Sequence, residues 1–385
     1  MKKLAIITTH PIQYYAPVFK LLAKKTQLKV FYTWGEQSMV KYDKGFAKQI
    51  EWDIPLLDGY DYQFLANTSK DPGTHHFNGI INPGLVSAVQ DFEPNAILIY
   101  GWAWKSHLKA LRFFKGKIPI YFRGDSTLLD QQNNFKNLLR KIFLKWIYSH
   151  VDKAFYVGST NKNYYSQFGL KEKQLIFAPH AIDNNRFEKI DQQETIKIRK
   201  KLSIGADSIL ILFAGKLEPK KAPDLLLKAL KKLANPNLQL LFVGNGQLQK
   251  ELKTTAGNFS NIHFMDFQNQ SKMPAIYQAC DLFCLPSKGP NETWGLAVNE
   301  AMAAGKAILV STKVGCAVDL VKPGINGEVF KSNDLDDLMQ KLTELAESKE
   351  KLTKMGIQSQ QIIQNWSFEK QVEAIVNTFY NKNAK

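Results

Sequence analysis

The feature that most constrains the fold is a regular alternation of two patterns along the whole chain. Short runs of Val, Ile, Leu, Phe and Ala alternate with longer stretches of helical periodicity. Because these runs are almost continuously apolar, they predict parallel strands that are covered on both faces. The predicted strands are Lys3–Thr8, Leu28–Thr33, Ala96–Tyr100, Ile118–Arg123 and Lys153–Val157 in the first half, and Ser208–Ala214, Leu238–Val243, Asn261–Met265, Asp281–Leu285 and Ala307–Ser311 in the second.

Amphipathic stretches such as Ala222–Leu233 fill the intervals, and Pro223 suits the first turn of that helix. Strand–helix alternation in both halves of 385 residues predicts an α/β protein with two doubly wound, Rossmann-like domains. Since ligands bind at the carboxyl ends of parallel strands, we expect the site in a cleft between facing domains. The predicted boundaries are 1–185 for the first domain, 186–206 for a polar linker, 207–366 for the second domain, and 367–385 for a last helix that crosses back to the first.

Composition excludes several classes of protein. Hydrophobic residues make up 44% and charged residues 22%, which is ordinary globular usage and not that of a disordered chain. The longest apolar run, around Ala96–Trp104, is about half of what a membrane span needs. The apolar run after Met1 is too short for a signal peptide, and three cysteines are too few for a disulfide scaffold. We therefore expect a cytoplasmic protein with reduced thiols.

The charge balance is strongly basic. Lys and Arg total 51 against 35 Asp and Glu, a net charge of +16. Residues 1–190 carry 26 basic and 15 acidic side chains (+11), whereas residues 191–385 carry 25 and 20 (+5). A basic surface attracts nucleic acid, anionic lipid or phosphorylated substrates, and charge alone does not choose between them.

A lysine-rich turn follows the first predicted strand of the second half. The sequence from Gly215 contains Lys216 and Lys221, which flank the start of the helix Ala222–Leu233. Free backbone N–H groups and the helix dipole favour an anion there, and two ammonium groups suit a diphosphate. A solvated turn in a lysine-rich protein is the alternative.

Two glutamates follow the predicted strand Asp281–Leu285. Glu292 lies in a Gly/Pro/Asn loop, and Glu300 lies eight positions further on, in a helix of mostly small residues. Eight helical steps leave an offset of ~80°, so both side chains can face one cleft. Carboxylates accept hydrogen bonds from the vicinal hydroxyls of ribose or a sugar ring. A surface glutamate is the alternative for each.

Together these motifs resemble the family 4 (group 1) glycosyltransferases, which are retaining enzymes with the GT-B fold. The turn at Lys216 and Lys221, the Glu292-x7-Glu300 spacing and the glycine turn at Gly244 carry the resemblance, which covers the second domain throughout.

The resemblance implies a nucleotide-sugar, UDP- or GDP-linked, as co-substrate and no metal or other cofactor. It implies that Lys216 and Lys221 bind the diphosphate, that Glu300 binds the ribose, and that Glu292 with the following amides binds the transferred sugar. The predicted nucleotide-sugar contacts are Gly215, Lys216, Lys221, Gly244, Thr293, Trp294, Gly295, Leu296 and Glu300.

The first domain departs from the family pattern at two loops. The loop after Lys3–Thr8 lacks the family's glycines, so His10, Gln13 and Tyr14 become the candidate substrate-binding side chains. The loop after Ile118–Arg123 has Arg123 and Asp125 where the family often has a histidine.

Each residue of the second loop has a proposed task. Arg123 would stabilise the leaving phosphate, and Asp125 would bind a sugar or acceptor hydroxyl. The alternative is that Asp125 and Ser126 cap the next helix. His180 is expected to line the cleft, because its segment resembles the family's interdomain motif.

Possible metal motifs are rejected. Asp334 and Asp336 have metal-binding spacing, but they open the predicted helix Leu335–Leu345, where acidic residues suit the dipole. His75 and His76 lie in a loop without a partner motif. We therefore predict no metal site.

The stretch Phe135–Tyr148 allows two interpretations. Its apolar stripe contains Phe135, Leu138, Leu139, Ile142 and Trp146, and its flanks and back carry Lys136, Arg140, Lys141 and Lys145. One interpretation is an interfacial helix on an anionic membrane. The other, favoured for the stripe, is a core-packed helix with a basic solvated back.

The sequence therefore predicts a metal-independent glycosyltransferase of the cytoplasm, peripheral on the inner face of the membrane. It would act on a glycan or lipid-linked acceptor in polysaccharide or lipopolysaccharide biosynthesis, without nucleic acid. The alternatives are a GT-B sugar-nucleotide epimerase or phosphorylase, and a basic nucleic-acid-binding protein, for which no zinc-finger, helix-turn-helix or RNP motif is present.

Overall fold

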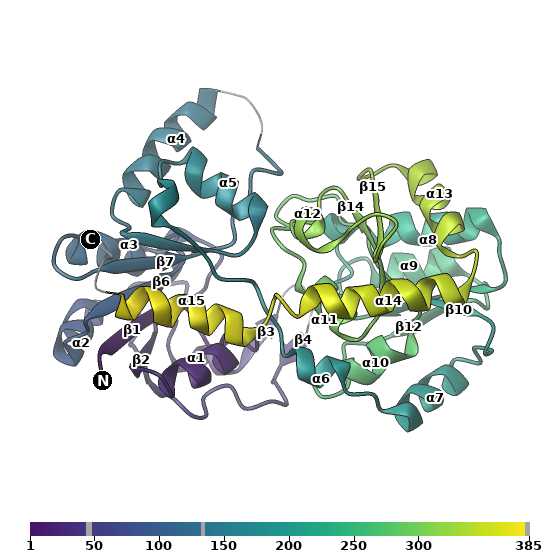
Figure 1. The fold of residues 1–385 in the computed structure, drawn as a ribbon, viewed down its shortest axis with the longest axis horizontal. Coiled ribbons are helices and arrows are strands. Elements are labelled where there is room, and N and C mark those ends of the chain that lie inside the picture. The colour runs from purple at the N-terminus through teal and green to yellow at the C-terminus, as the bar shows by residue number, and fades with distance from the viewer. Residues whose placement is uncertain (44–47, 132–134, 382–385) are drawn as a thin grey trace. The chain divides into compact units, whose positions relative to one another are not determined.

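The computed structural model describes residues 1–43, 48–131 and 135–381. The chain forms two compact units. Unit 1 consists of Met1–Lys41, Ile54–His180 and Phe368–Lys385, and unit 2 consists of Tyr42–Asp53 and Ala181–Ser367. Each unit contains a parallel sheet with helices around it, which confirms the predicted α/β class with two Rossmann-like domains (Figure 1).

Unit 1 is built on a seven-stranded sheet in which every neighbouring pair is parallel. Its strands, in spatial order, are β5 (Asp61–Phe64), β2 (Gln27–Tyr32), β1 (Lys3–Thr8), β6 (Ala96–Tyr100), β7 (Ile120–Arg123), β8 (Lys153–Tyr156) and β9 (Leu175–Phe177). The five predicted strands are present within two residues at each end. The edge strands β5 and β9 were not predicted. β5 is four residues long, half of them exposed, and β9 has only three residues, too few for a clear strand pattern.

Helices cover both faces of this sheet. The helices of unit 1 are α1 (Ala16–Ala23), α2 (Leu85–Phe92), α3 (Lys105–Phe114), α4 (Phe135–Tyr148), α5 (Ser159–Gln167) and α15 (Phe368–Tyr380). Alternate strand residues such as Ile7, Ile99 and Phe122 form one core with α2, α3, α4 and α5. On the other face α15 packs against α1, and the Tyr380 hydroxyl donates to the Lys25 carbonyl at 2.9 Å.

The orientation of α4 corrects the prediction that its apolar stripe packs into the core. Leu144, Ile147 and Tyr148 face the core, whereas the stripe residues Leu138, Leu139, Ile142 and Trp146 are exposed. The helix has two apolar sides, and periodicity alone favoured the wrong one. Phe135 and Lys136 have side chains outside the described set.

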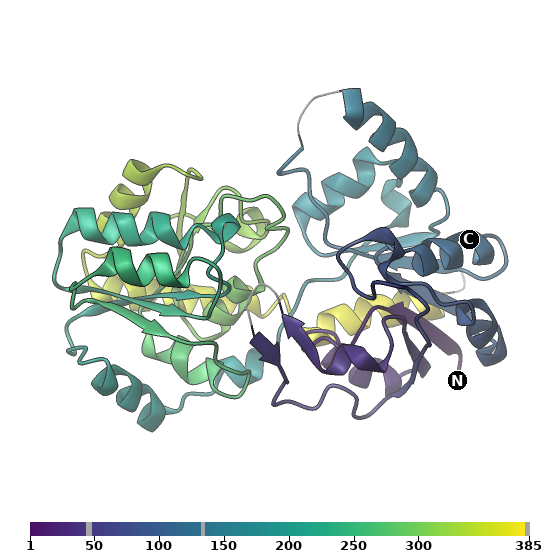
Figure 2. The same cartoon turned by 180° about the vertical axis from the view of Figure 1, so that it is seen from behind.

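Unit 2 repeats the same topology on a six-stranded parallel sheet. Its strands, in spatial order, are β12 (Ile262–Met265), β11 (Leu238–Val243), β10 (Ile209–Ala214), β13 (Leu282–Leu285), β14 (Ala307–Ser311) and β15 (Gly327–Phe330). Its helices are α6 (Asn184–Glu188), α7 (Gln192–Lys201), α8 (Pro223–Leu233), α9 (Gln249–Ala256), α10 (Met273–Ala279), α11 (Leu296–Ala303), α12 (Ala317–Leu320), α13 (Leu335–Leu345) and α14 (Lys349–Ile363). Figures 1 and 2 show α14 on one face of the sheet and α8 and α9 on the other.

The segment expected to be a linker, 186–206, is part of unit 2 and largely helical. The acidic residues that suggested a linker cap its helices. Asp183 accepts a hydrogen bond from the Arg186 N–H at 3.2 Å, and Asp191 accepts one from the Glu194 N–H at 3.0 Å. The polar composition therefore reflects helix starts, where aspartate is preferred, rather than a flexible connection.

The short segment Tyr42–Asp53 belongs to unit 2 although the chain on both sides of it belongs to unit 1. It contains parts of the small two-stranded sheet of β3 (Lys41–Asp43) and β4 (Lys48–Ile50). The Asn269 amide donates to the Glu51 carbonyl at 2.6 Å, and the Ser271 N–H donates to the Asp53 carboxylate at 3.1 Å. Within the described ranges, no helix combines the length and apolar composition that a membrane span requires.

Candidate functional site

The candidate residues gather where the strand order of each sheet reverses. In unit 1 the chain runs outward from β1 to β2 and β5 and then returns to β6 beside β1. In unit 2 it runs from β10 to β11 and β12 and returns to β13 beside β10. Doubly wound folds bind ligands at the carboxyl edge beside this reversal, because the connections diverge there and leave a crevice.

The turn that carries Lys216 packs backbone to backbone against the turn that follows β11. Gly215 and Gly244 both have positive φ, and a side-chain carbon on Gly244 would lie 2.1 Å from the Gly215 carbonyl oxygen. The Leu217 N–H donates to the Asn245 carbonyl at 2.9 Å. The close approach requires glycine at 244, and it fixes the backbone from which the Lys216 side chain extends.

Lys221 and Glu292 form an ion pair at this edge. Lys221 closes the turn Pro219–Lys221 before α8, and its Nζ lies 2.6 Å from Glu292 Oε2. The side chains are 17% and 7% exposed, and the Ser287 hydroxyl donates to the same oxygen at 3.0 Å. The predicted diphosphate cation and the predicted sugar-binding carboxylate are thus brought together.

The backbone after Glu292 is fixed by the loop after β14. The Gly315 N–H donates to the Glu292 carbonyl at 3.1 Å, and a side-chain carbon at Gly315 would lie 1.8 Å from the Thr293 carbonyl oxygen. Trp294 is buried, and its indole N–H donates to Asn299 Oδ1 at 2.9 Å. The Trp294 ring is therefore committed to the core, so this stretch offers its backbone to a ligand.

Glu300 is buried on α11, which rules out the surface alternative. The Tyr277 hydroxyl donates to Glu300 Oε2 at 2.8 Å. Gly295, with φ of 96°, precedes the first residue of the helix, Leu296. Glu292 consequently lies outside the helix, and the helical-offset argument used to relate it to Glu300 does not apply.

In unit 1 the loop after β1 presents His10 with defined partners. Its Nδ1 lies 2.9 Å from the Thr9 hydroxyl, and its ring packs edge-on against Trp34 at 5.2 Å between centroids. Gln13 and Tyr14 are half-buried in the turn before α1. These contacts orient the His10 ring, which was predicted as a substrate-binding group because this loop lacks glycines.

Arg123, the last residue of β7, is buried at 2% exposure. Its two terminal nitrogens donate to the Ala178 and Pro179 carbonyls at 2.8 and 3.0 Å. The guanidinium therefore holds the segment that leads into His180, a positioning task that the sequence did not suggest. Its predicted contact with a leaving phosphate stays a prediction.

His180 is buried, and burial together with the Arg123 charge lowers its pKa to about 3, so the imidazole is neutral at physiological pH. Its ring stacks on that of Tyr15 with centroids 6.4 Å apart, and the Tyr15 and Tyr100 ring centroids are 4.8 Å apart. A neutral ring among aromatic side chains can exchange single hydrogen bonds with a substrate but supplies no charge.

Asp125 belongs to a loop that α5 holds in place. The Tyr165 hydroxyl donates to the Gly124 carbonyl at 2.9 Å, and the Asn161 amide donates to the Ser126 carbonyl at 2.8 Å. The alternative helix-capping role of Asp125 is wrong, because no helix starts within residues 126–131. Burial and, to a lesser degree, the Asp125 charge raise the pKa of Tyr15, the residue whose ring stacks on His180.

Sequence reasoning missed the residues that support these side chains. Ser287 and Tyr277 hydrogen-bond the two glutamates, and Trp34 and Tyr15 pack against the two histidines. Tyr15 adjoins the singled-out loop and could have been included. Ser287 lies five residues before Glu292 in the same loop and could also have been included. Tyr277 and Trp34 come from other elements, and no local pattern marks them.

Two motifs outside the site have definite structures. Asp334 caps α13 by accepting from the Asp337 N–H at 3.1 Å, which confirms the helix-start interpretation. His75 and His76 share a partner, since their Nε2 atoms lie 3.1 and 3.3 Å from Asp71 Oδ2. These three exposed or half-exposed side chains are close enough together to hold a metal ion.

Solved structures of glycosyltransferases share this fold. Anabaena HepE in complex with UDP has a TM-score of 0.74 at 19% identity, covering 98% of this chain and 99% of that one. WaaG, a glycosyltransferase involved in lipopolysaccharide biosynthesis, has a TM-score of 0.69 at 12% identity, covering 98% and 100%. The fold therefore defines a GT-B protein.

Sequence comparison finds similarity to one family and to several curated relatives. Residues 194–362 match the family described as glycosyl transferases group 1. It is 28% identical over 244 residues to a GDP-mannose-dependent monoacylated alpha-(1-6)-phosphatidylinositol monomannoside mannosyltransferase of Corynebacterium glutamicum, covering 61% of this chain and 63% of the relative. It is 25% identical over 224 residues to D-inositol 3-phosphate glycosyltransferase of Nocardia farcinica, covering 55% and 48%. The chain thus matches about half to two thirds of these relatives' lengths.

Proposed function

We propose that the protein transfers a sugar, with retention, from a nucleoside-diphosphate sugar to a glycan or lipid-linked acceptor in cell-surface polysaccharide or lipopolysaccharide biosynthesis. The observation that carries the proposal is the Lys221–Glu292 pair beside the fixed Lys216 turn, within the stretch that matches the family. This arrangement combines cations for a diphosphate with carboxylates for sugar hydroxyls.

The proposed transfer depends on where negative charge develops as the donor reacts. As the glycosidic bond breaks, negative charge grows on the leaving diphosphate, so Lys216 and Lys221 stabilise the transition state more than the ground state. The buried Glu300 carboxylate accepts hydrogen bonds from ribose hydroxyls. No step in this scheme requires a metal ion, because the lysine ammonium groups supply the positive charge.

The donor is a UDP- or GDP-linked sugar. HepE was solved with UDP, and the Corynebacterium relative is GDP-mannose-dependent, so both nucleotides occur among similar proteins. That relative's acceptor is a phosphatidylinositol mannoside, which supports a lipid-linked acceptor for this chain. The +11 charge of residues 1–190 supports peripheral contact of unit 1 with an anionic membrane at its inner face.

A thermal-shift screen against UDP, GDP, ADP and their sugars tests the donor assignment. Ligand binding to the folded state raises apparent stability, by about 2.7 kcal/mol at a hundredfold excess over Kd. We expect one nucleoside diphosphate to raise the melting midpoint of the wild type but not of Lys221→Ala. Lys220→Ala is the matched control, because it removes a neighbouring charge that pairs with Glu218. The same shift in Lys221→Ala would contradict the site.

The acceptor test measures sugar transfer to lipid-linked and soluble glycans, with release of nucleoside diphosphate. Isomerisation of the nucleotide-sugar without any acceptor would instead support the epimerase alternative. Salt-sensitive binding of duplex DNA without protection by nucleotide-sugars would revive the nucleic-acid alternative.

A further inference from the structure

Helix α4 turns a broad apolar face outward. Its described exposed apolar residues, each 39% to 61% exposed, are Leu138, Leu139, Ile142, Phe143 and Trp146. At 100° per residue they fill an arc of ~140°. The opposite side of the helix is buried in unit 1 through Leu144, Ile147 and Tyr148. An exposed contiguous apolar patch on an otherwise well-packed unit indicates a surface that binds something.

The aromatic part of this face is ordered by its own contacts. Phe143 stacks on Trp146 with centroids 5.7 Å apart, and Trp102 packs edge-on against Phe143 at 5.7 Å. The Arg112 guanidinium lies 5.7 Å from the Trp146 ring centroid. Tryptophan beside a cationic side chain is typical of the boundary between lipid headgroups and acyl chains.

Basic side chains border the apolar arc on both sides. Lys141 and Lys145 follow one edge of α4, Arg140 follows the other, and Arg112 comes from α3. Among the residues that the structure describes, none of these four side chains forms an ion pair with a carboxylate. Their charges are therefore available to an external anion, and an apolar stripe bordered by cations matches an anionic lipid surface.

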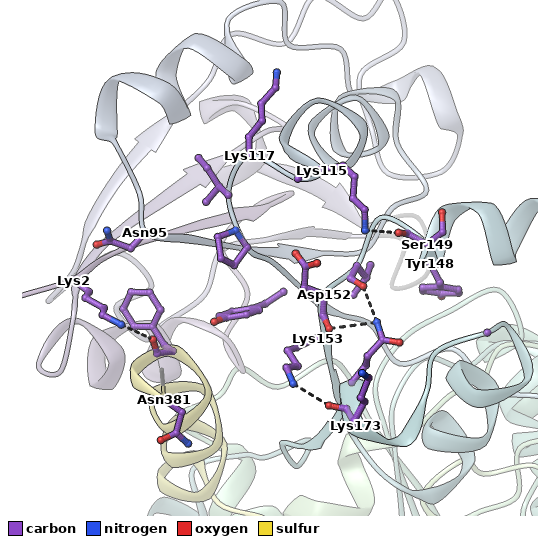
Figure 3. Close-up of a pocket in the computed structure, with 18 residues that line it drawn as sticks. Lys2, Asn95, Lys115, Lys117, Tyr148, Ser149, Asp152, Lys153, Lys173 and Asn381 are labelled. Atoms are coloured by element: carbon purple, nitrogen blue, oxygen red, sulfur yellow. Dashed lines mark hydrogen bonds between the residues drawn. The ribbon is translucent and has the colours of Figure 1, made fainter. Parts of the chain in front are cut away.

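The C-terminal end of α4 borders a basic pocket of about 700 Å³ (Figure 3). Its lysines are Lys2, Lys115, Lys117, Lys153 and Lys173. Lys115 donates to the Ser149 carbonyl at 2.5 Å, and Lys153 donates to the Lys173 carbonyl at 2.9 Å. These bonds hold the ammonium groups without neutralising them, and Asp152 is the one carboxylate among the lining residues. The pocket thus extends the positive field beyond the helix.

We propose that the α4 face, defined by Leu138, Leu139, Ile142, Phe143 and Trp146, is a docking surface for an anionic lipid bilayer, into which these side chains insert. The inference rests on the proposed function, because a lipid-linked acceptor requires the enzyme to meet the membrane. The charge border selects the bilayer over a second copy of the chain, since two faces with the same cationic border repel each other.

Co-sedimentation of the full chain with vesicles tests the surface. We expect tenfold or stronger binding to phosphatidylcholine vesicles containing phosphatidylglycerol than to phosphatidylcholine alone. Leu139→Ser/Ile142→Ser should lose this binding at least tenfold, and Lys141→Gln/Lys145→Gln should lose the preference for anionic lipid. The control Ile196→Ser/Ile357→Ser removes two exposed isoleucines from unit 2, at 65% and 50% exposure, and should bind as the wild type does.

Insertion can be read at one position. The three native cysteines are buried, so Ile142→Cys provides a single accessible thiol for an environment-sensitive dye. Its emission should shift to the blue on anionic vesicles only. The proposal would be overturned by equal binding to neutral and anionic vesicles, or by dye emission that does not shift. It would also be overturned if Leu139→Ser/Ile142→Ser lost dimerisation of the protein and not vesicle binding. Nucleotide thermal shifts should be identical in these variants, so failure of the donor site and failure of the docking surface give different results.

Discussion

The carboxyl edges of the two sheets, where the candidate site residues lie, differ in chemical character. The edge of unit 2 places charged side chains against each other, with Lys221 and Glu292 at 2.6 Å and Glu300 buried under Tyr277. The edge of unit 1 is mostly aromatic, and its buried His180 has a pKa lowered to about 3. The buried Arg123 donates to backbone carbonyls of the segment leading to His180.

Under the proposed function, this difference indicates which half of the transfer reaction each edge serves. Fixed charges stabilise the diphosphate that every nucleotide-sugar shares, whatever sugar it carries. A neutral aromatic surface instead recognises shape and single hydroxyl groups, which vary between acceptors. The family match over residues 194–362 follows the charged edge, and unit 1 is where substrate selectivity has room to differ.

The largest effect should come from removing the paired cation of unit 2. Lys221→Ala should lower kcat/KM by about 10²–10³, because one fixed donor to a developing anion contributes about 3–4 kcal/mol. Initial rates of nucleoside diphosphate release measure this. Lys220→Ala, five residues from Gly215 and partly exposed, should stay within a factor of about three of the wild type. Equal losses in both variants would mean that general surface charge, and not the pair, is responsible.

The second effect concerns the buried carboxylate on α11. Glu300→Gln should lower donor turnover by about tenfold or more, since an amide accepts hydrogen bonds from ribose hydroxyls more weakly than a carboxylate does. Tyr277→Phe, which removes the hydroxyl that holds Glu300, should lower it less. Turnover is measured at fixed acceptor, with circular dichroism to verify folding. Wild-type turnover in Glu300→Gln would remove Glu300 from the site.

The third effect tests whether unit 1 keeps its histidines neutral. His107 of α3 is fully buried, its Nε2 lies 2.8 Å from the Thr33 hydroxyl, and burial lowers its pKa from 6.5 to about 4. Between pH 6.5 and about 4, this histidine binds a proton in the unfolded chain but stays neutral in the folded protein. The free energy of unfolding should therefore fall by up to roughly 3 kcal/mol as pH drops from 6.5 to 4.

His107→Gln should flatten this slope even if the variant is less stable at every pH. Urea unfolding between pH 4 and 7.5 gives the slope, and the exposed His75→Asn serves as the control. An unchanged slope in His107→Gln would show that the buried histidine does not govern the acid sensitivity of unit 1.

The smallest expected effect is that of chelation. Because lysines supply the positive charge at the donor edge, EDTA should leave the transfer rate unchanged. The cluster Asp71, His75 and His76 provides the counter-test, since it is the place in the described residues where a metal ion fits. Loss of activity on chelation that His75→Ala/His76→Ala reproduces would give the cluster a functional metal.

Much of this architecture could be predicted from the sequence. Buried parallel strands appear in the sequence as continuous apolar runs, and ten strands could be predicted from them. The candidate residues Lys216, Lys221, Glu292 and Glu300 could be predicted from motifs. The tasks of Arg123 and the outward turn of α4 were not predictable, because both depend on neighbours far away in the chain. The two helices in and beside the expected linker were not predicted, because the aspartates that cap them made the segment look like a polar connection.

The interleaving of the two units has a consequence for how the protein can be divided. The chain passes between the units after Lys41, Asp53, His180 and Ser367. A fragment that ends at His180 would lack α15, which packs on α1, and a fragment from 181 to 367 would lack the segment that binds Asn269 and Ser271. Neither half therefore keeps all of its contacts alone. Recombination with a protein of the same fold at a single junction would leave both partners with unfilled contacts, and an exchange that respects the fold needs four junctions.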